Sequence, residues 1–104
     1  MGWFYLCVAG LLEIGWAIGL KYTEGFSRPW PSLLTLLAMV GSLYFLALGL
    51  RTIPVGTGYA VWTGIGAIGT ATLGILLFAE STALPRLASL ALIILGILGL
   101  KASS

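Results

Sequence analysis

The sequence predicts an all-α membrane protein with four transmembrane helices in a single transmembrane domain, residues 1–104. Hydrophobic residues make up 60% of the chain and charged residues only 8%, whereas a soluble domain carries about 25% charged residues. The mean hydropathy is +1.11. Prolines, glycines and charges divide the chain into four apolar segments, each close to the roughly 20 residues that cross a bilayer as a helix.

The expected helices follow one another with short connections and lie near residues 2–20, 32–50, 57–79 and 86–102. The connections read KYTEGFSRPWP, RTIPVG and ESTALP, and each contains proline, glycine or charge, as helix ends do. We do not expect the first helix to be a cleaved signal peptide, because it has no basic leading region and carries Glu13 inside its apolar stretch.

Lys and Arg are almost evenly divided between the two sides of the membrane. Four spans place both termini on one side, so the first and third connections share the other. That side carries Lys21, Arg28 and Arg86, and the opposite side carries Arg51 and Lys101. Because orientation follows the excess of Lys and Arg on the cytoplasmic side, a difference of one residue gives little direction. We therefore expect copies to insert in both orientations.

Four helices are too few to enclose a substrate cavity alone. Many transporters are built from inverted repeats, with the site near the bilayer midplane between them. A short chain that inserts both ways can build the same symmetry from two copies. The charge balance and the length together predict an antiparallel, dual-topology homodimer.

Glu13 lies close to the midpoint of the first expected helix and is the main candidate for a functional residue. A charge at the bilayer centre costs about 2.5–3.5 kcal/mol on insertion scales, and such residues usually mark ion or substrate pathways. Glu24 and Glu80 lie in the connections, where water solvates them, and every Lys and Arg lies at a helix end. Glu13 is therefore expected either to be protonated or to pair with a cation that comes and goes.

Small and aromatic residues share the helical face of Glu13, namely Ala9, Gly10, Trp16 and Ala17. Small residues allow another helix or a ligand to approach closely. Trp16 offers a π face to a cation and an indole N–H to a carboxylate. These neighbours are expected to line a cavity.

The third expected helix begins GTGYAVWTGIGAIG, in which Tyr59 and Trp62 share a face and would form a second aromatic wall. GIGAIG has the spacing of a dinucleotide-binding loop, but no strand precedes it and it lies inside an apolar span, so we reject that reading. Glycine in a helix interior costs about 1 kcal/mol relative to alanine. Gly64, Gly66 and Gly69 are therefore expected to allow a hinge or close packing.

Ser42 is the strongly polar residue at mid-membrane depth in the second expected helix. It could hydrogen-bond the Glu13 carboxylate or a carbonyl of its own helix, and both partners remain open. In the fourth expected helix, Ser89 and Gly96 are seven residues apart on one face, which indicates a small-residue contact between helices. That helix suits a scaffold or dimer interface better than substrate binding.

Several classes of function are excluded by composition. The chain has no histidine, so a metal site built on imidazole is excluded, and we expect neither a metal nor a cofactor. The single Cys7 cannot form an internal disulfide and is expected to be a small core hydrophobe. A net charge of +2 without a basic cluster argues against nucleic-acid binding. We expect a transporter rather than an enzyme.

Over its whole length the chain resembles the small multidrug resistance family, most clearly in AGLLEIGWAIGLKYTEGFSRPWPS, IPVGTGYAVWTGIGAIG and the final GILGLKASS. The resemblance implies that Glu13 is the family's glutamate and that Tyr59 and Trp62 are its aromatic pair. Ser89 and Gly96 match its dimer motif, with serine at the first position where drug exporters tend to have glycine. The family implies a proton-coupled antiporter that works as an antiparallel dimer in the bacterial cytoplasmic (inner) membrane.

Within the family, EIGW and the late GLKA resemble the guanidinium exporter subtype. This resemblance implies a binding cluster of Gly10, Glu13, Trp16, Ser42, Tyr59 and Trp62. Guanidinium is planar and presents N–H donors that match a carboxylate bidentately. We therefore expect export of guanidinium and small substituted guanidines, with two protons exchanged per substrate.

Three alternative functions compete with this interpretation. The first is a proton-coupled exporter of quaternary ammonium or lipophilic cationic drugs. The second is a proteolipid of a rotary ring, which also carries a mid-membrane glutamate but needs only a two-helix hairpin. The third is a non-transporting assembly subunit, which leaves Glu13 without a role.

Overall fold

The structure is a computed structural model that describes residues 1–103, and every regular element within that range is a helix. The helices are α1 (Gly2–Tyr22), α2 (Pro29–Gly49), α3 (Val55–Phe78) and α4 (Leu84–Ala102). Each is long and apolar enough to cross a membrane. The prediction of an all-α chain with four membrane helices is confirmed.

Three helices begin two or three residues before the expected positions 32, 57 and 86, and prolines explain the difference. Pro29 is the first residue of α2, Pro85 is the second residue of α4, and Pro54 directly precedes α3. Proline is tolerated in the first turn of a helix, because the N–H that it lacks would have no intrahelical partner there. Pro29 and Pro85 therefore lie inside the first turns of α2 and α4, and Pro54 is the residue that caps α3.

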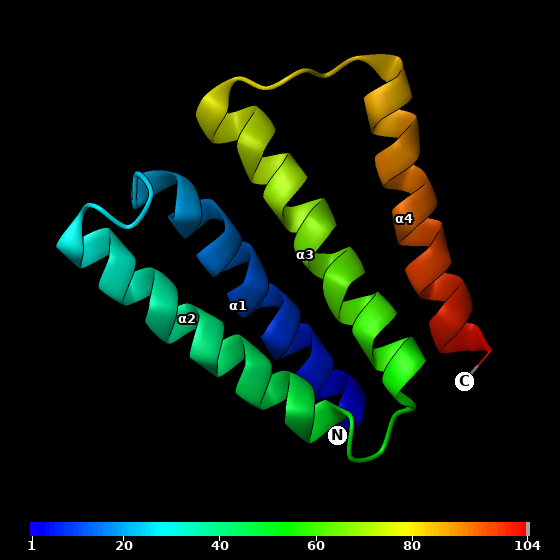
Figure 1. Cartoon of the computed structure of the whole chain (residues 1–104). Helices are drawn as coiled ribbons and strands as arrows, with labels where there is room; N and C mark the ends of the chain where they lie inside the picture. The colour runs from blue at the N-terminus through cyan, green and yellow to red at the C-terminus, as the bar shows by residue number, and fades with distance from the viewer. Residues whose placement is uncertain (104) are drawn as a thin grey trace.

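Helix α1 packs along both α2 and α3, and α4 packs against α3. Figure 1 shows α1 and α2 side by side, α3 on the other side of α1, and α4 at the outer edge beyond α3. The close approach of α1 and α3 depends on a missing side chain, since a Cβ at Gly10 would lie 2.6 Å from Cγ2 of Ile65. Small residues allow such close packing between membrane helices.

The buried core is small and lies among α1, α2, α3 and the turn that precedes α3. Its apolar members are Leu6, Ala9, Leu46, Ile53, Val61 and Trp62. Most other large apolar side chains are exposed in the single chain, as expected where the surrounding solvent is hydrocarbon. No residue of α4 is buried, although the structure describes that helix in full.

Cys7 is exposed, so the expectation that it is a core residue is wrong. Its neighbour Leu6 and the later Ala9 point into the core from α1. One residue along a helix turns the side chain by about 100°, which carries Cys7 from that face to the outside. In a lipid environment an apolar thiol has no need of burial within the protein.

The end of α3 turns the chain sharply toward α4. Ala79 adopts the left-handed conformation, with φ 53° and ψ 38°, and its N–H bonds the carbonyl of Gly74. The N–H of Glu80 also reaches the Gly74 carbonyl, at 3.3 Å. A non-glycine residue in this conformation costs roughly 1–2 kcal/mol. The two hydrogen bonds hold the turn and so determine where the Glu80 side chain starts.

Candidate functional site

Glu13 projects from the middle of α1 toward α3 and lies against Gly66. A Cβ placed on Gly66 would overlap the Glu13 carboxyl group, so the glycine provides the space that the carboxyl occupies. The Oε1 atom of Glu13 is buried and has no hydrogen-bond partner within residues 1–103. Within residues 1–103 the one ion pair joins Arg86 to Glu80. No Lys or Arg of the described chain therefore pairs with Glu13.

Trp16 lies one turn after Glu13 and also has a buried polar atom without a partner. Its indole Nε1 makes no hydrogen bond to any residue that the structure describes. A buried polar group left unpaired costs about 1–3 kcal/mol, and more when it is charged. One acceptor and one donor therefore lie one turn apart on α1. A cation with N–H donors can bind the Glu13 oxygen and stack on the indole face, whereas the indole N–H needs an acceptor such as a carboxylate.

Ser42 joins three helices through two buried hydrogen bonds. Its hydroxyl donates to the carbonyl of Ala9 on α1 at 2.7 Å, and the indole N–H of Trp62 on α3 donates to its oxygen at 2.9 Å. Ser42 is fully buried. The partners considered from the sequence were the Glu13 carboxylate and a carbonyl of α2, and the structure instead uses α1 and α3. Ser42 thus links α1, α2 and α3 beside the Glu13 site.

Tyr59 and Trp62 form the aromatic pair on α3, but only one ring is open. Their ring centroids lie 5.6 Å apart with the planes tilted by 56°. Tyr59 is 58% exposed, whereas Trp62 is 7% exposed and has its N–H bound to Ser42. In the single chain, Tyr59 is therefore the ring that can contact a ligand, and the buried Trp62 packs against it.

The α3 glycines of the expected hinge each meet a different neighbour. Gly64 faces α4, where a Cβ would lie 2.8 Å from Cδ1 of Ile97. Gly66 faces Glu13 and Gly69 faces Ile14, both on α1. The helix is continuous from Val55 to Phe78. In this conformation the three glycines serve close packing.

Ser89 and Gly96 both lie exposed on α4. The Ser89 hydroxyl donates to the carbonyl of Pro85 in its own helix, at 2.8 Å. A Cβ on Gly96 would meet no atom of residues 1–103 within 4 Å. The two small residues therefore present an unoccupied surface of α4 in the single chain.

A second polar feature, which the sequence pattern did not predict, lies where α1 and α3 end. A cavity of about 330 Å³ is lined there by the charged residues Lys21, Glu80 and Arg86 and by Ala17 and Thr70 among others. Arg86 Nη2 donates to Glu80 Oε1 at 2.8 Å, and both side chains are partly exposed. Such an ion pair is worth only about 0.2–1 kcal/mol.

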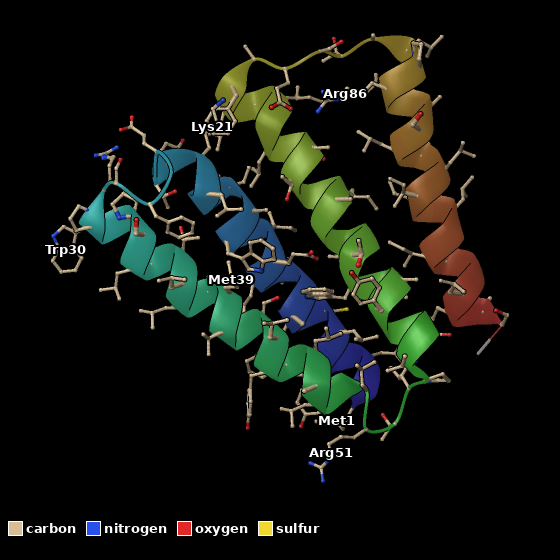
Figure 2. The ribbon with its side chains drawn as sticks, viewed as in Figure 1. Met1, Lys21, Trp30, Met39, Arg51 and Arg86 are labelled. Carbon is tan, nitrogen blue, oxygen red and sulfur yellow. The ribbon has the colours of Figure 1, made fainter. Side chains whose placement is uncertain are left out.

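Lys21 completes the mouth of this cavity. Its Nζ lies 5.0 Å from the centroid of the Phe78 ring. Figure 2 shows Lys21 and Arg86 at the same end of the bundle, opposite Met1 and Arg51. Glu80 was expected to be a solvated loop charge, and the structure instead pairs it with Arg86. The six-residue spacing of the pair across a proline-containing connection does not by itself predict an ion pair.

Comparisons with known proteins agree over the length of the chain. The family model described as Small Multidrug Resistance protein matches residues 1–93. A relative from Yersinia pseudotuberculosis is 59% identical over 104 residues and covers all of both chains. A relative from Escherichia coli K12 is 60% identical over 104 residues, which are 100% of this chain and 99% of the relative. Both are named guanidinium exporter. The chain therefore belongs to the small multidrug resistance family and is a multi-pass transporter of the bacterial inner membrane.

Proposed function

We propose that this chain exports guanidinium and small substituted guanidines across the bacterial inner membrane in exchange for protons. The observation that carries the proposal is the Glu13 carboxyl group, which lies in mid-helix against Gly66 with a buried oxygen that has no partner in residues 1–103. Relatives that are 59–61% identical over 104 residues and named guanidinium exporter support the choice of substrate.

The chemistry of the site suits a small planar cation. Guanidinium offers N–H donors in a fork that matches a carboxylate, and its charge is delocalised and weakly hydrated. Glu13 would accept these donors, while the exposed Tyr59 ring and the Trp16 indole would face the cation. A protonated carboxyl group cannot make the same ion pair. Proton and substrate therefore compete for Glu13, which is the requirement for exchange.

The working unit in this proposal is an antiparallel homodimer. No residue of α4 is buried in the single chain, and Ser89 and Gly96 offer a small-residue surface on that helix. A second copy would cover this surface and bring a second Glu13 to the site. The nearly even division of Lys and Arg between the two sides supports insertion in both orientations.

Two Glu13 residues would exchange two protons for each monovalent substrate. One guanidinium that enters between the carboxyl groups displaces both protons, so each cycle moves one net charge inward. A membrane potential contributes about 2.3 kcal/mol per charge per 100 mV and would drive export. Alternating access then needs only that the two copies exchange conformations, and Gly64, Gly66 and Gly69 are the candidate hinge.

Transport current from proteoliposomes on a capacitive electrode tests this function. Guanidinium added without an imposed potential should give a current that scales with protein and is absent in Glu13→Gln. Glu24→Gln is the matched control, because Glu24 is an exposed loop glutamate and should keep the current. Saturable guanidinium exchange without net charge movement would reduce the ratio to one proton per substrate.

A second candidate function is export of quaternary ammonium cations, and the exposure of Tyr59 favours it. An open aromatic ring binds such cations through its π face without any N–H donor. The two functions differ in a competition assay. If the carboxylate selects cations with N–H donors, tetramethylammonium should leave the guanidinium-driven current unchanged. If the aromatic ring binds cations through its π face without such donors, tetramethylammonium should inhibit the current.

A further inference from the structure

We propose that Glu80 is an outer guanidinium-binding site at the mouth of a route to Glu13, and that the Arg86 side chain occupies it until a substrate cation takes its place. This inference rests on the proposed function and adds a second site to it. It is carried by the position of Glu80, by the chemistry of its partner, and by the cavity that leads from it toward Glu13.

The backbone holds the Glu80 carboxylate over the end of α3. The left-handed Ala79 turns the chain, and the N–H groups of Ala79 and Glu80 both bond the Gly74 carbonyl. The carboxylate then folds back against Gly74, where an added Cβ would collide with it. A charge that simply extended from a flexible loop would need no such glycine. The turn and the space at Gly74 therefore fix the position of the carboxylate.

The present partner of Glu80 has the same chemical group as the substrate. Arg86 donates from Nη2 to Oε1 at 2.8 Å, so a guanidinium group already binds this carboxylate. Both side chains are partly exposed, at 32% for Arg86 and 41% for Glu80. An ion pair in contact with water is weak and exchanges readily. A free guanidinium ion can therefore replace Arg86, whose charge moves into water and is screened there.

The cavity behind this pair extends along α1 and α3 in the direction of Glu13. Its lining also includes Ala17 and Thr70. Ala17 is four residues after Glu13, on the same face of α1, and Thr70 is four residues after Gly66, which contacts the Glu13 carboxyl. The cavity therefore continues the face on which Glu13 lies, with about one helical turn between them.

Thr70 supplies a polar group along this route. Its Oγ1 is buried and makes no hydrogen bond to any residue in the range 1–103. A hydroxyl oxygen accepts a hydrogen bond from a guanidinium N–H as well as from water. A cation that leaves Glu80 would meet this acceptor before it reaches Glu13. In an antiparallel dimer, one copy of the route would open toward each side of the membrane.

The test measures radiolabelled guanidinium uptake into proteoliposomes over a range of concentrations. Glu80→Gln should raise the KM about fivefold to tenfold and leave the saturating rate within about twofold, because the outer site concentrates substrate but performs no exchange. Arg86→Gln should lower the KM, because it removes the internal competitor. Glu24→Gln is the matched control and should keep the wild-type KM.

Gly74→Ala separates the position of the charge from its presence. Its methyl group displaces the Glu80 carboxylate, which is the end of a flexible side chain, so the helix should still form. This variant should raise the KM as Glu80→Gln does. Equilibrium dialysis supplies a second measurement. In a Glu13→Gln background, Arg86→Gln should retain guanidinium binding that a further Glu80→Gln removes.

The outcomes separate this inference from the function on which it rests. If the wild-type protein moves no guanidinium, the proposed function fails and the outer site fails with it. If the wild type and Glu80→Gln share one KM while Glu13→Gln is inactive, the function stands and the outer site is wrong. Residual binding that persists in Glu13→Gln, Arg86→Gln and Glu80→Gln combined would also overturn the outer site.

Discussion

Two polar clusters in the same bundle are satisfied to different degrees. In the first, which we call the Ser42 cluster, Ser42, Trp62 and the Ala9 carbonyl complete one another's hydrogen bonds and are buried. In the second, the Glu13 cluster, Glu13 and Trp16 each keep a buried polar atom that no residue of the described chain satisfies. Both clusters draw on α1, yet only the second leaves its polar groups open to a ligand.

The difference separates structure from function among residues of similar type. Two tryptophans occupy equivalent chemical roles as N–H donors, but Trp62 donates to Ser42, and Trp16 has its N–H free of any bond to residues 1–103. A satisfied buried polar group stabilises one arrangement of helices, whereas an unsatisfied one is a cost that a ligand can relieve. We therefore expect the Ser42 cluster to govern stability and the Glu13 cluster to govern transport.

Glu13→Gln should have the largest effect and should separate the two properties completely. We expect guanidinium transport to fall about a hundredfold or more, since an amide cannot exchange a proton for a cation. The melting temperature should stay the same or rise, because the change removes a buried ionisable group. Uptake assays and thermal unfolding in detergent measure the two effects. A large fall in melting temperature would instead give Glu13 a structural role like that of the Ser42 cluster.

Gly66→Ala should impair transport next most strongly while the fold survives. The added methyl overlaps the Glu13 carboxyl and forces it out of its position. Alanine is the better helix former by about 1 kcal/mol, so α3 itself gains stability. We expect transport to fall about tenfold or more, because small misplacements of a reacting group cost this much. Gly99→Ala is the control, since a Cβ there meets no described atom within 4 Å.

Substituting each tryptophan by phenylalanine tests the comparison with one chemical change. Trp16→Phe should lower transport about tenfold and leave the melting temperature unchanged, because its N–H stabilises nothing within the described chain. Trp62→Phe should lower the free energy of unfolding by about 1–2 kcal/mol, because it removes a buried hydrogen bond to Ser42. Loss of stability in Trp16→Phe together with loss of transport in Trp62→Phe would contradict the division into two clusters.

Ser42→Ala should produce the smallest effect on transport among these changes. It leaves the Trp62 N–H and the Ala9 carbonyl without their partner, at a cost of about 1–3 kcal/mol in the free energy of unfolding. Thr72→Ala is the matched control, since that hydroxyl bonds only Ile68 of its own helix from an exposed position. Denaturant titration of both variants should show a loss of stability for Ser42→Ala alone.

The helices and the importance of Glu13 could be predicted from the sequence, because both depend on local properties. Low charge and apolar length are enough to predict four spans, and Glu13 stands out because every other charge lies at a helix end or in a connection. The contacts between helices could not be predicted. The bond from Ser42 to Ala9 joins residues 33 positions apart, and only the arrangement of α1 against α2 brings them together.

The glycines and the charged turn show the same limit. The run of glycines in α3 predicted either a hinge or close packing, but the pairing of Gly66 with Glu13 depends on the register of two helices. Glu80 was expected to be a solvated charge, since the left-handed Ala79 that turns it toward Arg86 carries no glycine signal. Residues whose partners lie on another element need coordinates before their roles can be assigned.

Proton release on guanidinium binding tests the central claim most directly. Guanidinium added to the purified protein in weakly buffered detergent solution should acidify the medium, with about two protons released per dimer if both Glu13 residues exchange as a pair. The release should saturate along with binding and should vanish in Glu13→Gln. Guanidinium binding without proton release, or release that persists in Glu13→Gln, would contradict exchange at Glu13.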